Sequence, residues 1–343
     1  MKMSVAIEAL LNRQDLPAEA MRALMRQIMS GDATPAQIGG FLVALRAKGE
    51  TIEEVVAAVE VLREMSLKVH VDTRHLIDTC GTGGDGAHTF NISTASAFVA
   101  AAAGARVAKH GSRSVSSRTG SADVLEAAGI NLHLDPEAVA HCISDVGLGF
   151  LFAQNHHGAM RHAVGPRREL GVRTLFNLLG PLSNPAGAPN QLIGVFSAEW
   201  IEPLAQVLKV LGSRHVMVVH AEDGLDEISI GAPTRVAELI HGEIRVWTLT
   251  PEQFGLQRAS LDTLAVDSSE QSLAVIRRIF SGEAGPHRDI VLLNAGAAIY
   301  CAGVAETLEA GVAMARAAID HGAAQQKLDD LIRVSTSLTP APP

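Results

Sequence analysis

The sequence predicts an α/β protein with a small all-helical N-terminal domain and a larger α/β domain built on a mostly parallel central sheet. The first observation is that residues 1–70 carry only the periodicity of helices. The second is that short apolar runs alternate with Ala-rich or amphipathic helical stretches after residue 70, a pattern typical of parallel strands covered on both faces. With 343 residues, of which 47% are apolar, the chain is long enough to fill both cores.

Three helices are predicted within residues 1–70, each from a start signal followed by apolar residues at helical spacing. Asp15 and Pro17 stand where an N-cap and an early helical proline belong. Thr34, followed by a proline, opens the second helix. Thr51, with a glutamate three residues later, has the pattern of a capping box and opens the third.

Beyond the helical domain, short apolar runs bounded by glycine or polar residues predict strands at 75–80, 106–110, 215–221 and 289–295. The segment 241–249 alternates between polar and apolar residues, which predicts an added antiparallel strand.

The domain boundaries follow from this alternation. The helical domain covers 1–70 and is joined by a crossing helical segment near 165–188, where the alternation is interrupted. The α/β domain covers 71–335, and the Ser, Thr and Pro-rich tail 336–343 is expected to be disordered. The cleft between domains and the carboxyl ends of parallel strands are both favoured ligand sites.

The composition excludes several classes of protein. A formal net charge of −9 argues against nucleic acid as a partner. The cysteines Cys80, Cys142 and Cys301 are odd in number and lack CxxC spacing, which argues against a disulfide framework and favours a reducing compartment. The first residues lack the apolar run of a signal peptide, and no apolar stretch is long enough to span a membrane. We therefore expect a cytoplasmic protein without a membrane partner.

A glycine-rich loop at 81–86 leads into a helix whose N-cap is predicted at Ser93 or Thr94. Glycines let the backbone approach a phosphate closely, and side-chain donors such as Thr89 and Asn91 lie at the positive end of the helix. The loop therefore suits a phosphate ligand.

The same glycines match the GxGxxG pattern of dinucleotide-binding folds, which is the alternative interpretation. Two details count against it. The helix does not begin within the glycine run, and the next strand ends at Lys109 and His110, where a ribose-binding acid would be expected. The carboxylate of Asp85 would repel a ligand that is only anionic. Its presence is explained if the ligand also brings a cation or ribose hydroxyls.

A second loop follows the strand at 106–110 and combines Lys109, Arg113 and Arg118 with several serines. Because it follows a strand of the same sheet as the glycine loop, a phosphate role is favoured over a solvated Ser-rich turn.

A third loop follows the strand at 215–221 and contains the acids Glu222, Asp223, Asp226 and Glu227. Adjacent carboxylates at the carboxyl edge of a parallel sheet could hold Mg²⁺, which takes one or two carboxylates together with phosphates and waters. The alternative is an ordinary charged loop at a strand end.

The crossing segment contains Arg161, Arg167 and Arg168, and no spacing typical of a zinc site. Arg167 follows a Gly–Pro turn and is the better candidate for a fixed position, where a guanidinium could bind a carboxylate through two parallel hydrogen bonds. The alternative is that these cations simply lie on a helix surface.

Four motifs have the order and spacing found in the anthranilate phosphoribosyltransferases. They are GTGGD, NIST, KHG followed by R and SS, and the stretch Gly–Ser–Ala–Asp–Val–Leu–Glu. The chain resembles that family over essentially its whole length. The resemblance implies Mg²⁺-dependent transfer of the phosphoribosyl group of 5-phosphoribosyl-1-diphosphate to the amine of anthranilate, in tryptophan biosynthesis. It also implies a homodimer, which agrees with N-terminal helices that carry more apolar surface than a small lobe can bury.

The resemblance implies that residues of both loops and of the crossing segment bind the substrates: Gly81, Gly84, Asp85, Thr89, Asn91, Ile92, Ser93, Thr94, Lys109, His110, Gly111, Ser112, Arg113, Ser114, Val115, Ser116, Ser117, Ser121 and Arg167. It selects Asp226 and Glu227, with the Ser93 hydroxyl, as metal ligands. An arylamine is neutral at pH 7, so no residue is assigned as a strong general base.

One position departs from the family. The residue after KHG is usually an asparagine that helps to hold anthranilate, and here it is Ser112, which is shorter and lacks an amide. The acceptor is therefore expected to bind more weakly or in another position.

Two rival functions stay open. A pyrimidine nucleoside phosphorylase-like enzyme would not need the Asp226–Glu227 pair, and a non-catalytic relative that binds nucleic acid should be basic and lack these acids. Nothing in the sequence indicates a partner subunit such as an anthranilate synthase.

Overall fold

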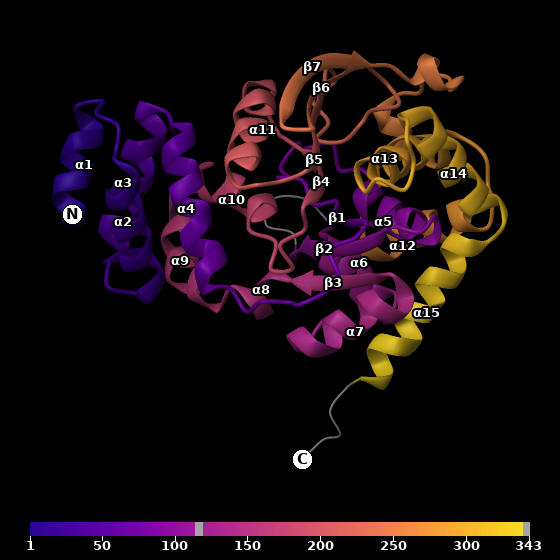
Figure 1. Cartoon of the computed structure of the whole chain (residues 1–343), viewed down its shortest axis with the longest axis horizontal. Helices are drawn as coiled ribbons and strands as arrows, with labels where there is room; N and C mark the ends of the chain where they lie inside the picture. Colours follow the sequence, from indigo (N-terminus) through magenta and orange to yellow (C-terminus); the bar gives the residue numbers. More distant parts are fainter. Residues whose placement is uncertain (114–118, 339–343) are drawn as a thin grey trace.

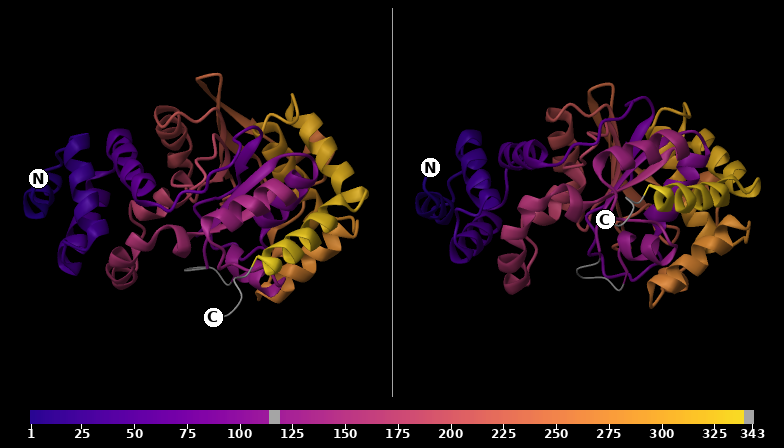
Figure 2. Two further views of the ribbon diagram at one scale, coloured as in Figure 1. Left: turned by 60° about the horizontal axis from the view of Figure 1, so that its bottom comes forward. Right: turned by 90° about the horizontal axis from the view of Figure 1, so that it is seen from below.

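The computed structural model describes residues 1–113 and 119–338. Its first part is a group of helices at one end of the molecule, seen at the left of Figure 1 and in both views of Figure 2. These helices are α1 (Met3–Leu11), α2 (Ala18–Ser30), α3 (Pro35–Lys48) and α4 (Ile52–Met65).

Two of the predicted helix starts are confirmed by their capping contacts. The hydroxyls of Thr34 and Thr51 accept hydrogen bonds from the backbone three residues later, and both starts have complete capping boxes. The predicted N-cap of α2 is wrong, because Pro17 takes that position. The carboxylate of Asp15 is instead bound to the ammonium of Lys48, 2.7 Å away.

The described residues form a sheet of seven strands. They are β1 (Leu76–Asp78), β2 (Arg106–Gly111), β3 (Leu148–Phe152), β4 (Asn190–Gly194), β5 (His215–Ala221), β6 (Thr234–Ile240) and β7 (Glu243–Leu249). Their spatial order is β3-β2-β1-β4-β5-β6-β7; the first five run parallel, and β6 and β7 are antiparallel. The mostly parallel sheet and the antiparallel strand near 241–249 are thus confirmed. The order grows outward from β1 in both directions, which creates a switch point between β1 and β4.

The remaining helices that the structure describes are α5 (Ile92–Ala102), α6 (Ser121–Ala127), α7 (Pro136–Val146), α8 (Ala153–His156), α9 (Arg161–Leu170), α10 (Phe176–Leu182), α11 (Ile201–Val210), α12 (Ser269–Phe280), α13 (Pro286–Cys301), α14 (Leu308–Asp320) and α15 (Ala323–Ser337).

The sheet separates two hydrophobic cores. Met217 and Val219 of β5 belong to a core shared with α5 and α13, whereas Val216 and Val218 belong to a core shared with α11 and α4. Alternate residues of one strand thus point to opposite faces. Figure 1 shows α11 on one side of the sheet and α13 and α14 on the other. The second core continues into the helical group, so the two parts of the molecule share buried apolar surface.

The strand predicted at 289–295 is wrong, because these residues form part of α13. Pro286 occupies the first turn of this helix, and the run from Ile290 to Leu293 is buried. A helix that is buried on all sides has no polar face, so its sequence lacks the helical period and resembles a buried strand.

The crossing segment contacts both parts of the molecule. Helix α9 packs against α2 and α3, and α10 packs against α4 and β2. Arg46 of α3 donates to the carbonyl of Arg173 at 2.6 Å, and Arg63 of α4 donates to the carbonyl of Leu182 at 2.8 Å. Backbone carbonyls of the crossing segment thus accept hydrogen bonds from the helical group.

The predicted disordered tail is wrong at its start, because α15 continues to Ser337. The hydroxyls of Thr336 and Ser337 donate to helix carbonyls at 2.8 Å, which satisfies them within the helix. Residues 339–343 lie outside the described residues. No described helix combines the length and the hydropathy needed to cross a membrane.

Candidate active site

Three loops follow the carboxyl ends of parallel strands: 79–91 after β1, the loop after β2, described at residues 112–113 and 119–120, and 222–233 after β5. The first and third are joined directly. The backbone N–H of Gly83 donates to Asp226 Oδ2 at 2.7 Å, and that of Ser93 donates to Glu227 Oε1 at 3.1 Å. The glycine loop and the acid pair, which the sequence places far apart, therefore form one site.

The acid pair has an excess of negative charge. Its side chains are half-buried, and burial together with the charges of Asp85 and Glu227 raises the pKa of Asp226 well above its usual range. Burial also raises the pKa of Glu227 to about 7, against the opposing charge of Lys109. Carboxylate oxygens beside the Ser93 hydroxyl are the hard donors that a divalent cation such as Mg²⁺ takes, so these residues fit that ion.

Lys109 lies beneath the glycine loop. Its ammonium is buried and donates to the carbonyl of Thr79 at 3.0 Å and to the hydroxyl of Ser93 at 3.2 Å. The structure therefore brings Lys109, Ser93 and Glu227 together, as three of the predicted site residues.

Asp78 links the strands and the chain segment beneath the site through hydrogen bonds. Its carboxylate is buried, and it accepts hydrogen bonds from the backbone of His110 at 3.1 Å and from Asn184 Nδ2 at 2.7 Å. Burial raises the pKa of Asp78 to about 6. These contacts tie β1 to β2 and to the chain that follows α10. Neither Asp78 nor Asn184 was among the predicted site residues.

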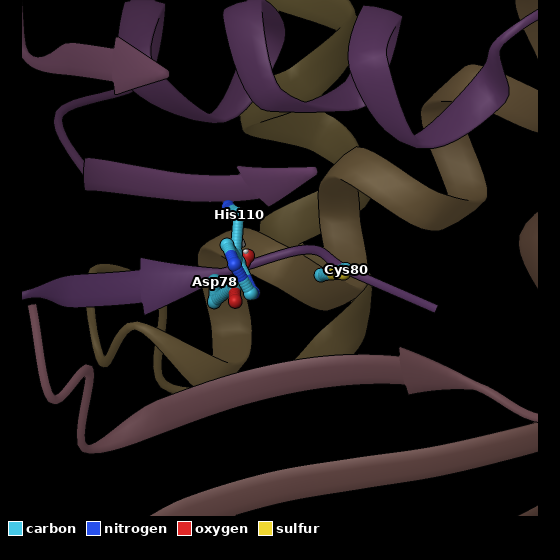
Figure 3. Close-up of side chains that lie close together, drawn as sticks. All are labelled: Asp78, Cys80 and His110. Atoms are coloured by element: carbon cyan, nitrogen blue, oxygen red, sulfur yellow. Dashed lines mark hydrogen bonds between the residues drawn. The ribbon is translucent and has the colours of Figure 1, made fainter. Parts of the chain in front are cut away.

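Asp78, Cys80 and His110 lie close together, with one ligand atom of each within 4.8 Å of the others (Figure 3). Both oxygens of Asp78 are already used, and His110 Nδ1 is bonded to the carbonyl of Gly180 at 3.0 Å. Burial lowers the pKa of His110 to about 3 and raises the pKa of the Cys80 thiol. We interpret this cluster as packing beneath the site, with a neutral His110 ring and a neutral Cys80 thiol, and not as a metal centre.

Glycines allow close approaches at this edge. A Cβ at Gly111 would lie 2.3 Å from Ser121 Oγ, and one at Gly81 would lie 3.2 Å from Asp226 Oδ2. Gly194, at the end of β4, was not predicted: a Cβ there would lie 1.4 Å from the carbonyl oxygen of Asp226. Only glycine lets the acid loop lie against the end of β4 in this way.

The N-terminus of α5 gathers further predicted residues. The helix begins at Ile92 with Asn91 as N-cap, so the N-cap predicted at Ser93 or Thr94 is wrong by two to three residues. The Asn91 side chain does not cap the helix, because its Oδ1 accepts hydrogen bonds from other hydroxyls. Thr94 is buried, and Thr89 lies just before this turn, in a bridge with Ala265. Asp85 and Gly84 lie in the glycine loop itself.

The second loop is described only at its ends, because Ser114, Val115, Ser116 and Ser117 lie outside the described residues. Ser112 is exposed, and its hydroxyl donates to the carbonyl of Arg113 at 3.0 Å. The Arg113 guanidinium is paired with Asp123 at 3.1 Å and with Glu126 at 2.7 Å. Its charge is thus already balanced by α6, which begins at Ser121.

Arg167 of α9 is half-buried, with its guanidinium 5.2 Å from the ring centroid of Phe176. Burial lowers the pKa of Arg167. Within residues 1–113 and 119–338, no carboxylate lies within ion-pair distance of it. A partly desolvated guanidinium without a counter-ion is suited to an anionic ligand. Arg161 and Arg168 are exposed, as the surface interpretation expects.

Two family models match the chain: "Glycosyl transferase family, helical bundle domain" over residues 4–66 and "Glycosyl transferase family, a/b domain" over residues 73–325. A helical bundle beside an α/β domain, with a glycine loop facing an acid pair at the sheet edge, therefore defines a glycosyl transferase of this two-domain class.

The relatives narrow the class. Anthranilate phosphoribosyltransferase of Thioalkalivibrio sulfidiphilus is 64% identical over 98% of this chain and 100% of its own length, and that of Methylococcus capsulatus is 64% identical over 98% of each. The crystal structure of the Thermus thermophilus enzyme has a TM-score of 0.91 at 45% identity, covering 96% of this chain and 99% of that chain. The Saccharomyces cerevisiae enzyme in complex with PRPP and Mg has a TM-score of 0.90 at 26% identity, covering 98% of each chain. The chain belongs to the anthranilate phosphoribosyltransferase family.

Proposed function

We propose that this chain transfers the phosphoribosyl group of 5-phosphoribosyl-1-diphosphate to the amine of anthranilate, giving N-(5-phosphoribosyl)anthranilate and diphosphate in tryptophan biosynthesis. Relatives that are 64% identical over 98% of the chain carry the corresponding name. The observation that carries the proposal is the bonding of Asp226 and Glu227 to the backbone of the glycine loop and α5. It places hard metal ligands beside N–H groups that suit a diphosphate.

Mg²⁺ is the proposed cofactor, and the yeast relative has been solved with PRPP and Mg. Asp226, Glu227 and the Ser93 hydroxyl would hold it. The ion would neutralise the diphosphate leaving group as its bond to the sugar breaks. The raised pKa values of the two acids support this assignment, because burial and the neighbouring carboxylate charges raise them and a bound cation would stabilise the ionised forms.

The chain's own residues act by positioning and by electrostatics. The glycine loop offers N–H groups to the phosphates, and Lys109 adds a positive charge beneath them. As diphosphate leaves, the anomeric carbon gains oxocarbenium character, and the amine must be held near it. The arylamine is already neutral at pH 7, so His110, whose pKa is about 3, is assigned a binding or packing role.

Arg167 is the residue proposed to bind the acceptor substrate, anthranilate. Its guanidinium has no counter-ion among the described residues and would bind the anthranilate carboxylate. Ser112 stands near the beginning of the second loop, where it offers a hydroxyl in place of the family's amide.

We also propose that the protein is a homodimer. Val5 and Leu11 of α1 are 54% and 64% exposed, and Val43 of the adjoining α3 is 44% exposed. Covering this apolar surface with a second copy removes it from water. Sedimentation equilibrium should give twice the chain mass, and a monomer at micromolar concentration would contradict the proposal. The free state of all three cysteines supports a reducing, cytoplasmic location.

The first experiment follows the loss of anthranilate fluorescence on mixing with 5-phosphoribosyl-1-diphosphate, with and without Mg²⁺. We expect a decay that requires both the diphosphate sugar and the metal. No decay with anthranilate, together with phosphate-dependent cleavage of a pyrimidine nucleoside, would overturn the proposal in favour of a nucleoside phosphorylase.

A further inference from the structure

A fully buried serine from a distant helix reaches the start of α5. Ser272 lies on α12, and its side-chain oxygen is 3.0 Å from the backbone nitrogen of Asn91 and 2.9 Å from Asn91 Oδ1. The hydroxyl of Thr119, at the end of the second loop, lies 3.1 Å from the same Oδ1. Asn91 thus connects the glycine-loop side of the site, the second loop and α12.

The protons in this cluster determine how the Asn91 amide is oriented. A serine hydroxyl has one proton. Ser272 Oγ accepts the N–H of Asn91 and donates its own proton to Asn91 Oδ1. Thr119 donates to the same oxygen. The oxygen end of the amide therefore faces two donors, and the nitrogen end must face the other way.

The side-chain nitrogen of Asn91 is left available. No described residue accepts a hydrogen bond from Asn91 Nδ2. An asparagine at an N-cap usually turns its oxygen onto the first helical N–H groups, but here that oxygen is held by Ser272 and Thr119. The backbone N–H groups of Asn91, Ile92 and Ser93 already donate to Ser272, Phe90 and Glu227. The Asn91 amide nitrogen can therefore donate to an anionic ligand at this end of the helix.

We propose that Ser272 is a positioning residue for 5-phosphoribosyl-1-diphosphate. Together with Thr119 it holds the Asn91 amide so that Nδ2 faces the ligand. The inference rests on the proposed function for the identity of the ligand. Ser272 itself is fully buried, so it is assigned a role through Asn91 and no direct contact with the substrate.

The test compares Ser272→Ala with Ser96→Ala. Ser96 is a matched control because it is also fully buried and lies on α5, but its hydroxyl has no hydrogen-bond partner among the described residues. Ser272→Ala should raise the KM for the diphosphate sugar by about tenfold, as expected for losing one orienting hydrogen bond, and change the KM for anthranilate less than twofold. Ser96→Ala should change neither. An unchanged KM for the diphosphate sugar, or an equal rise in both constants, would overturn the proposal.

A double-mutant cycle separates positioning from a general structural effect. If Ser272 acts through the Asn91 side chain, adding Ser272→Ala to Asn91→Ala should change the KM for the diphosphate sugar less than twofold. A further tenfold rise in the double variant would show that the hydroxyl acts only on the backbone, and the proposal would fail. If Ser272→Ala does not fold, Thr119→Val removes the other donor and should raise the same KM.

Calorimetric binding of the diphosphate sugar with Mg²⁺, without anthranilate, distinguishes this inference from the proposed function. Weaker binding in Ser272→Ala than in the wild type supports the inference even if no anthranilate is consumed. Equal binding in an active enzyme overturns the inference and leaves the proposed function intact.

Discussion

At the scale of single residues, Asp226 accepts a hydrogen bond from the backbone N–H of Gly83, and Glu227 accepts one from the backbone N–H of Ser93. Backbone donors fix the direction of each carboxylate but do not cancel its charge. The acids therefore stay orientated and electrostatically strained, which is the state that a metal ion would relieve.

We expect Asp226→Asn combined with Glu227→Gln to lower turnover chiefly by raising the Mg²⁺ concentration needed for half-maximal rate, by at least about tenfold. The measurement is the anthranilate fluorescence assay over a Mg²⁺ titration. Glu222→Gln, an exposed acid of the same loop, is the control. An unchanged titration in the double variant would remove these residues from the metal site.

Arg167 should act on the other substrate. Because its guanidinium has no counter-ion among the described residues, we expect Arg167→Ala to raise the KM for anthranilate by roughly tenfold or more and the KM for the diphosphate sugar much less. Arg168→Ala, at the exposed neighbouring position, should have little effect. Equal effects of Arg167→Ala on both substrates would indicate a structural role for this residue.

At the scale of elements, one buried carboxylate organises the helical group. Glu54 accepts hydrogen bonds from the backbone of Thr51 at 2.8 Å and of Leu16 at 2.9 Å, and from the ammonium of Lys48 at 2.8 Å. It therefore joins the start of α4 to the end of α3 and to the loop before α2. The capping box that the sequence predicts is also a tertiary contact.

Glu54→Ala should lower the free energy of unfolding by about 3–5 kcal/mol, because it leaves the Lys48 ammonium and two N–H groups without this acceptor in a buried position. Urea denaturation measures the loss. Glu53→Ala, exposed in the same helical turn, should change stability by no more than about 0.5 kcal/mol. A loss below about 1 kcal/mol for Glu54→Ala would show that Asp15 and water replace the missing acceptor.

At the scale of the whole molecule, neutral histidines lie between the sheet and the crossing segment. The rings of His110 and His157 are 5.1 Å apart. Burial, with a smaller contribution from His156, lowers the pKa of His157 from 6.5 to about 4. A lowered pKa in the folded state stabilises the fold fully above pH 6.5, and this contribution is lost as the pH falls towards 4.

We therefore expect the stability difference between the wild type and His157→Gln to depend on pH. Relative to the variant, the wild type should lose on the order of 2 kcal/mol between pH 7.5 and pH 4.5. Urea denaturation at a series of pH values gives this difference directly. Parallel curves for the two proteins over that range would contradict the assigned pKa.

Much of the fold could be predicted because its signals are local. The starts of α3 and α4 follow from Thr34 and Thr51, whose capping partners are three residues away. The start of α5 was misplaced because Asn91 uses its side chain for Thr119 and Ser272, which are distant in sequence. Helix α13 was mistaken for a strand because its burial on all sides removes the helical period.

The site was predicted in parts and assembled only by the fold. Its residue types were readable because phosphate and metal chemistry require glycines, hydroxyls and adjacent carboxylates. Arg113 shows that residue type alone does not establish a binding role. Its charge suits a phosphate, but in the folded chain it is paired with Asp123 and Glu126 of α6. Gly194 and Ser272 had no local sequence signal. Gly194 is required by the Asp226 carbonyl and Ser272 contacts the Asn91 side chain, and only the packed structure brings these groups close.

By itself the sequence determined the two-domain organisation, the mostly parallel sheet and the chemical character of the three loops, because periodicity, capping and loop chemistry act over a few residues. Tertiary structure alone decided that the loops after β1 and β5 join, through contacts such as Gly83 with Asp226, and that Ser272 orients Asn91. These contacts depend on the spatial order of the strands and on how α12 packs, which are set by burying both faces of the sheet together.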